Sequence, residues 1–104
     1  MHDVIRQGDV LLVKVDSIPT NAVRDTAAGD VILAYGEVTG HAHRIKESSK
    51  VQVWSAGAER FIRAMEDVSV THEEHTAVVL EKGATYRQVF QVEERGEEVR
   101  RVAD

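Results

Sequence analysis

Short hydrophobic runs, each bounded by glycine or by polar residues, recur along the chain. Within several of them apolar and polar positions alternate. Val68, Val70 and His72 would share one face of an extended segment, and Ser69 and Thr71 the opposite face. A period of two between turn-forming residues is typical of β-strands with one buried face. The pattern therefore predicts a fold made of many short strands.

The same pattern predicts nine strands and a tail. The strands are Val4–Arg6, Val10–Val15, Val31–Tyr35, Glu37–Ile45, Val51–Ser55, Arg60–Met65, Val68–His72, Ala77–Glu81 and Thr85–Glu93. The apolar spacing around Arg60–Met65 would also suit two turns of helix. Residues 24–30 are predicted as a loop, and the tail Glu97–Val102 as an edge strand or a short helix.

Composition supports this interpretation. Val, Ile and Thr together supply 28 of the 104 residues, against 4 Leu. Branching at Cβ suits the pleated sheet better than the helix. A chain of this length accommodates one domain, which we place at residues 1–104. We expect an all-β fold, specifically a small single-domain β-barrel or jelly roll.

Charge and cysteine content exclude several classes of function. The net charge is −5, so no basic surface predicts binding to nucleic acid or to anionic lipid. The apolar runs are far shorter than the roughly 20 residues that a membrane helix needs. Cysteine is absent, which excludes disulfides, zinc–thiolate sites and thiol nucleophiles. A cytoplasmic protein is expected.

Four of the five histidines fall in two close pairs. His41 and His43 form a His-x-His within a predicted strand, so both rings would point to the same face. His72 ends a strand with apolar inward positions, and His75 lies in the predicted loop just beyond. Because both pairs fall at strand ends, we expect them to converge, and imidazole nitrogens at such a point can bind one metal ion.

The donor atoms available in the sequence limit which metal ion is expected as the cofactor. Imidazoles and carboxylates without thiolates suit a divalent transition metal such as Zn, Fe, Mn or Ni. Glu47, Glu73 and Glu74 are the carboxylates close to the histidines in sequence. Tyr86 and Gln88, on the last long strand, are the residues predicted to line an adjoining pocket for a small molecule.

The segment containing the first histidine pair resembles the first motif of the cupin family. Gly36 is followed by a short spacer, then His41-x-His43, and then Glu47. The turn at Gly83 resembles the start of the second cupin motif.

The resemblance covers about residues 36–90 and implies a double-stranded β-helix with a metal ion in its mouth. Tyr86 stands where the family has its third histidine. The ligands that the resemblance implies are His41, His43 and Glu47, with His75, His72 or Tyr86 itself in place of the missing histidine.

Two other functions stay open. One is a non-catalytic interaction module that self-assembles through edge strands, which the length of Thr85–Glu93 and the charged tail indicate. We expect a homo-oligomer. The other is a metal-free pocket for a sugar or small acid, with the histidines as hydrogen-bond donors or as a general base. Whether the protein is an enzyme is left open, because metal ligands alone do not identify a reaction.

Overall fold

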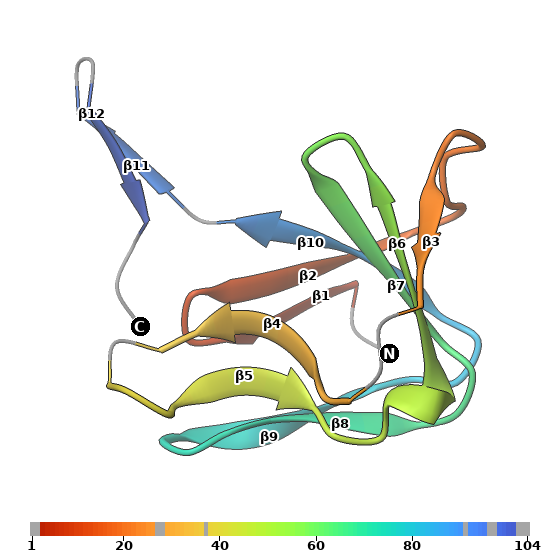
Figure 1. The fold of residues 1–104 in the computed structure, drawn as a ribbon, viewed down its shortest axis with the longest axis horizontal. Coiled ribbons are helices and arrows are strands. Elements are labelled where there is room, and N and C mark those ends of the chain that lie inside the picture. The colour runs from red at the N-terminus through yellow and green to blue at the C-terminus, as the bar shows by residue number, and fades with distance from the viewer. Residues whose placement is uncertain (1–2, 27–28, 37, 91, 96–97, 102–104) are drawn as a thin grey trace.

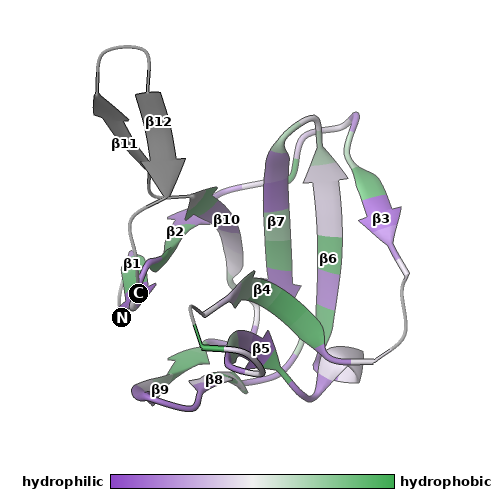
Figure 2. Cartoon of the chain, turned by 60° about the vertical axis from the view of Figure 1, so that its left-hand side comes forward, coloured by the Kyte–Doolittle hydropathy of each residue, from purple (hydrophilic) through white to green (hydrophobic). Residues whose placement is uncertain are grey.

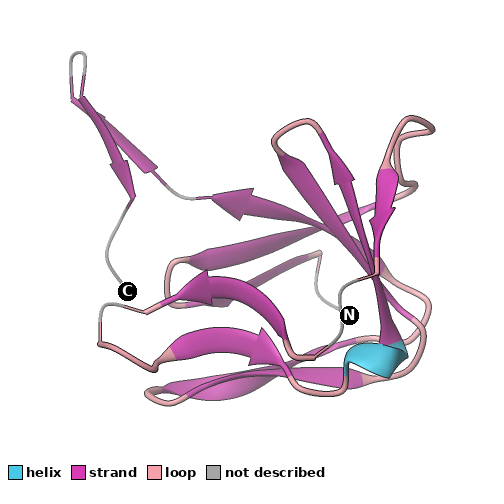
Figure 3. Ribbon diagram, viewed as in Figure 1, coloured by secondary structure: helices cyan, strands magenta, loops and turns pink. Residues whose placement is uncertain are grey.

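The computed structural model describes residues 3–26, 29–36, 38–90, 92–95 and 98–101. Within these ranges the regular structure is β-strand, apart from one 3-10 turn, η1 (Ser48–Lys50). The strands form two antiparallel sheets and one further hairpin (Figures 1 and 3). The predicted all-β class is therefore confirmed.

The larger sheet has six strands. In their order across the sheet they are β1 (Val4–Gln7), β2 (Val10–Val15), β10 (Thr85–Phe90), β7 (Glu59–Ala64), β6 (Val51–Ala56) and β3 (Val23–Asp25).

The smaller sheet has four strands. In order they are β4 (Val31–Tyr35), β5 (Ala42–Ile45), β8 (Val68–His72) and β9 (His75–Leu80). The remaining two strands, β11 (Val92–Arg95) and β12 (Glu98–Arg101), pair as a hairpin that extends away from both sheets in Figure 1.

The hydrophobic core lies between the two sheets. Leu12, Ile62 and Tyr86 of the larger sheet and Val70 and Leu80 of the smaller sheet are each at most 1% exposed and belong to one cluster. Figure 2 shows a hydrophobic stretch between hydrophilic ones along β7, where the adjacent residues Phe61 and Ile62 are both buried. Burial of this shared apolar surface is what holds the sheets together.

The expectation of a closed barrel is wrong. Among the described strands, β1 and β9 lie against each other at the outer edges of their sheets but form no ladder. Instead the side chain of Gln7 crosses between them. Its Nε2 donates to the backbone oxygens of Val70 and Thr76, both at 3.0 Å. Val70 lies on β8 and Thr76 on β9, so this one side chain connects β1 to two strands of the smaller sheet. The jelly roll stays a prediction that the sheet order does not confirm.

Several strand boundaries were predicted well and two segments were not. The strands Val10–Val15, Val31–Tyr35 and Val68–His72 are confirmed. Of the predicted segment Arg60–Met65, the residues up to Ala64 belong to a strand rather than a helix. Strand β3 lies at the edge of the segment predicted as a loop. All three of its residues are exposed, so no apolar pattern indicates it.

The predicted strand Glu37–Ile45 is too long. Its strand part begins only at Ala42, and Glu37 lies outside the described residues. The residues before it form a turn in which Gly36 N–H donates to the oxygen of His41 at 2.9 Å. Gly40 has a φ of +89°, which ends the extended conformation.

The predictions for the C-terminal part of the chain can be compared only with the residues that the structure describes there. The segment Thr85–Glu93 divides between β10 and β11, and Gln91 between them lies outside the described residues. The tail contains a strand, β12, while Glu97 and Val102 also lie outside the described residues.

Candidate metal centre

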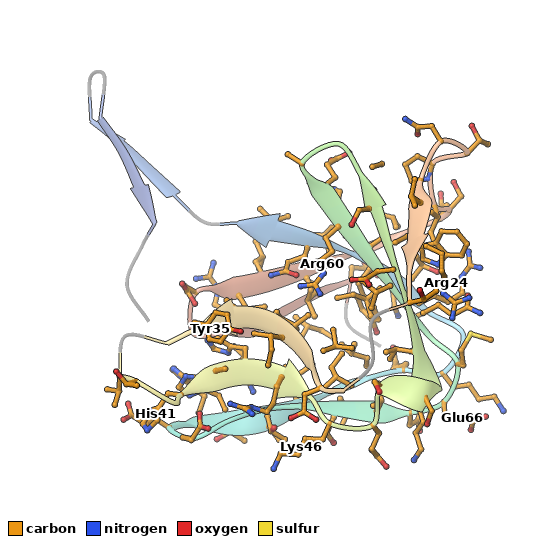
Figure 4. The ribbon with its side chains drawn as sticks, in the orientation of Figure 1. Arg24, Tyr35, His41, Lys46, Arg60 and Glu66 are labelled. Atoms are coloured by element: carbon orange, nitrogen blue, oxygen red, sulfur yellow. The ribbon has the colours of Figure 1, made fainter. Side chains whose placement is uncertain are left out.

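His41 lies in the turn that leads into β5. Its N–H donates to the oxygen of Val38 at 3.0 Å, and its oxygen accepts from Gly36, so the backbone here is held at both ends. The ring is partly exposed, and its Nδ1 lies 3.4 Å from Oε2 of Glu74. Figure 4 shows His41 at the end of the smaller sheet opposite to Lys46.

His72 and His75 face each other across a tight hairpin. They are Cα partners at the ends of β8 and β9, joined by the two-residue turn of Glu73 and Glu74. The expectation that His75 lies in a loop is therefore wrong, because β9 begins with it. Both histidines are partly exposed, although Nε2 of His72 is itself buried.

The two histidine pairs, about thirty residues apart in sequence, lie together in the structure. The ring centroid of His72 is 4.3 Å from that of His43, 4.8 Å from that of His75 and 5.9 Å from that of His41. The His43 and His75 centroids are 5.7 Å apart. The four imidazoles form a compact group, which we call the histidine cluster.

Three residues of this region bring possible ligand atoms close to one point. His41, His72 and Glu73 each offer a ligand atom, and these atoms lie within 4.8 Å of one another. Two histidines and one carboxylate are a common donor set for a divalent transition metal. Metal–ligand bonds of 2.0–2.2 Å require ligand atoms about 3.3 Å apart, so modest side-chain rotations would close the group around an ion.

Glu73 is held toward the cluster by the neighbouring strand. The backbone N–H of Ala42 donates to its Oε1 at 3.0 Å. This hydrogen bond and one from its own N–H hold the pKa of the Glu73 carboxyl below its ordinary value, with smaller contributions from His41 and Arg44. The carboxylate is therefore charged, and so ready to bind a cation, through the neutral pH range.

The hydrogen bonding of His72 defines the state of its ring. Its Nδ1 accepts from the N–H of Glu74 at 3.0 Å. In the neutral ring the proton is then on Nε2. An ion that binds His72 through either nitrogen must therefore displace this hydrogen bond, because binding at Nε2 moves the ring proton to Nδ1.

His43 is the buried member of the cluster. Its side chain is 0% exposed, its Nδ1 lies 2.8 Å from Oε1 of Gln7, and its Nε2 lies 3.4 Å from Oδ1 of Asp9. Gln7 and Asp9 come from the hairpin between β1 and β2, so the larger sheet supplies the polar partners of a histidine on the smaller sheet. The ring of His43 also packs against that of His72 at an angle of 34°, so this buried histidine contacts a residue of the more exposed group.

Glu47 is not brought to the cluster. It follows the end of β5 in the chain, and its carboxylate lies 2.9 Å from Nζ of Lys50. The carboxylate that accompanies the histidines is instead Glu73. Glu47 as a metal ligand stays a prediction from the cupin resemblance, and the geometry offers another residue for that role.

Tyr86 and Gln88 lie in the interior between the sheets. Tyr86 is 0% exposed, and its hydroxyl accepts from the N–H of Glu81 at 3.1 Å. Gln88 is 3% exposed and donates from Nε2 to the oxygen of Leu33 at 2.7 Å. Both side chains connect strands of the core. Their predicted place in a small-molecule pocket finds no support in these contacts.

Sequence reasoning did not identify Gln7 and Asp9. They flank Gly8 in a segment with the composition of an exposed turn, yet both are buried. A possible signal was the position of both residues at the ends of strongly apolar strands, where a hairpin can direct polar side chains inward.

The fold and this cluster define an all-β protein with two facing sheets and a group of imidazoles and carboxylates at one end. The chain belongs to a family described as a domain of unknown function (DUF8820), which matches residues 6–91. No curated protein and no solved structure matches the chain. Within the described residues, no helix is long and apolar enough to cross a membrane.

Proposed function

We propose that this protein binds a divalent transition metal through His41, His72 and Glu73. The observation that supports the proposal most is the approach of their three ligand atoms to within 4.8 Å of one another. Two of the residues come from one hairpin and the third from a different turn. A metal site requires ligands from separate segments to meet at one point. Two polar residues that are neighbours in sequence can lie side by side on a surface without such convergence.

A shallow depression beside the site supports binding of a small molecule at the ion. Its volume is about 190 Å³, and its walls include His72, Glu73, Arg44 and Lys46. Three protein ligands leave an open coordination position for such a molecule or for water. The two cationic side chains favour a small anion, such as a carboxylate. When bound, the ion would act there as a Lewis acid.

The cupin resemblance enters the proposal only in part. It implies His41 as a ligand, which the proposal retains, and Glu47, which the proposal replaces by Glu73. Of the metals that suit this donor set, Zn(II), Ni(II), Mn(II) and Fe(II) are the ones to test.

Isothermal titration of the metal-free protein with each metal tests the proposal. Glu73→Gln should weaken binding at least about tenfold, because a charged ligand is replaced by an amide. Glu47→Gln is the matched control and should bind as the unaltered protein does. Equal affinities for Glu73→Gln and the unaltered protein would contradict the proposed ligand set.

Self-assembly through strand edges is the second candidate function. Val4 on β1 and Val79 on β9 are 53% and 52% exposed, on the adjoining outer strands of the two sheets. A groove of about 690 Å³ runs between these edges and is lined by both valines. Exposed apolar edges favour pairing with a second copy.

Light scattering after gel filtration tests this second function. A homo-oligomer that dissociates in Val79→Lys would support it. A monomer at micromolar concentration, with or without chelator, would contradict it.

A further inference from the structure

A buried acid–histidine pair adjoins the proposed metal centre. The side chains of Asp9 and His43 are 4% and 0% exposed. Burial of a carboxylate is costly unless a positive charge or hydrogen-bond donors compensate it. The contacts of Asp9 and His43 indicate what could supply the positive charge that balances the Asp9 carboxylate.

Gln7 determines which nitrogen of His43 faces Asp9. Both hydrogens of the Gln7 amide have carbonyl acceptors, at Val70 and Thr76. Oε1 of Gln7 can then only accept, so His43 Nδ1, at 2.8 Å, is the donor. The other ring nitrogen, His43 Nε2, lies 3.4 Å from Oδ1 of Asp9.

The distance between these two atoms is informative. A hydrogen bond from a charged imidazole to a carboxylate is about 2.7–2.9 Å long, whereas His43 Nε2 and Asp9 Oδ1 are 3.4 Å apart. Among the described residues, Oδ1 of Asp9 has no hydrogen-bond donor. Two ligands of one tetrahedral ion, each bound at 2.0–2.1 Å, lie about 3.3–3.4 Å apart.

We propose that Asp9 Oδ1 and His43 Nε2 bind a second divalent transition-metal ion, in a buried position beside the first. The ring of His75 stacks on that of His43 with their centroids 5.7 Å apart, and a rotation of its side chain would bring a nitrogen to the ion as a third donor. Gln7 acts as a positioning residue, because its hydrogen bond keeps the proton on Nδ1 and leaves Nε2 for the metal. Neighbouring metal positions of this kind occur in two-metal centres.

The number of ions bound tests this inference separately from the proposed function, because the ligands differ. Titration of the metal-free protein with Co(II), followed by its visible absorption, should give two ions per chain. Asp9→Asn and Glu73→Gln should each give one. Asp16→Asn, at an exposed position, is the matched control and should give two.

The possible results separate the two proposals. One ion, lost in Glu73→Gln and kept in Asp9→Asn, overturns the buried position and leaves the first site. One ion with the opposite dependence overturns the first site and supports the buried one. One ion lost in both variants shows a single shared site and overturns the second position, and no bound ion overturns both.

A measurement on the unaltered chain covers the case in which Asp9→Asn does not fold. In the 15N spectrum of the histidine rings, Zn(II) should move the Nε2 resonance of His43 to a metal-bound position. His43 Nε2 that stays protonated at saturating Zn(II) would overturn the inference, since a proton would then supply the compensating charge.

Discussion

A methyl group added at Gly36 would press on two of the proposed ligands without removing either. A Cβ built at this position lies 3.0 Å from Nε2 of His72 and 3.2 Å from Cβ of His41. Ordinary contacts of this kind are about 3.5–4.0 Å, so the His72 ring must move by about 0.5–1 Å. Gly36 is not among the glycines with positive φ, so Gly36→Ala adds crowding without backbone strain.

We expect Gly36→Ala to weaken metal binding about 10–100-fold, because metal–ligand distances tolerate only about 0.2 Å. Crowding of a packed site typically costs about 1–3 kcal/mol of the free energy of unfolding. Rotation of the partly exposed His72 ring would relieve some of that cost. The melting temperature of the metal-free protein should therefore fall by less than a loss of this whole free energy would cause. Isothermal titration with Zn(II) and thermal unfolding without metal measure the two effects.

Gly83→Ala provides the control. Gly83 has a φ of +87° and nothing within 4 Å of a built Cβ, so its substitution adds backbone strain far from the histidines. It should lower stability by about 1–2 kcal/mol and leave the affinity for Zn(II) unchanged. An unchanged affinity in Gly36→Ala would refute the placement of His72 among the ligands.

Three further predictions concern hydrogen bonds. The hydrogen bond from the N–H of Ala42 lowers the pKa of the Glu73 carboxyl, so the folded state gains stability from the charged carboxylate. This stability is fully present above the ordinary pKa of 4.5 and is lost as the pH falls through the lowered pKa of the folded state. Glu73→Gln should therefore reduce the fall in melting temperature that acid causes in the unaltered protein. Gln7→Ala removes three buried or partly buried hydrogen bonds and should lower the free energy of unfolding in urea by about 3 kcal/mol. Tyr86→Phe leaves the N–H of Glu81 without its acceptor and should cost about 1 kcal/mol in the same assay, with no change in metal affinity.

Local patterns predicted most of the strands because burial of one face imposes alternation. Val10–Val15 and Val68–His72 have the predicted bounds. Strand β3 was not predicted because all of its residues are exposed, and a strand without a buried face has no alternation of apolar and polar residues. The sheet order, and with it the absence of a closed barrel among the described strands, depends on long-range contacts such as those of Gln7 that no local pattern encodes.

For the site, sequence proximity indicated the two histidine pairs and three nearby carboxylates, but not which of Glu47, Glu73 and Glu74 would join them. Glu73 reaches the cluster because a two-residue turn directs it to the N–H of Ala42, thirty-one positions away. Glu47 has the spacing of the cupin motif, yet η1 begins just after it and Lys50 takes its carboxylate. Asp9 was missed because its burial arises from packing of one sheet against the other.

Anomalous scattering from crystals grown with Zn(II) tests the central claim most directly. The account predicts a peak at the zinc absorption edge about 2.0–2.2 Å from a ring nitrogen of His41, a ring nitrogen of His72 and a carboxylate oxygen of Glu73. A peak bound by Glu47 instead, or no peak within bonding distance of these three residues, would contradict it.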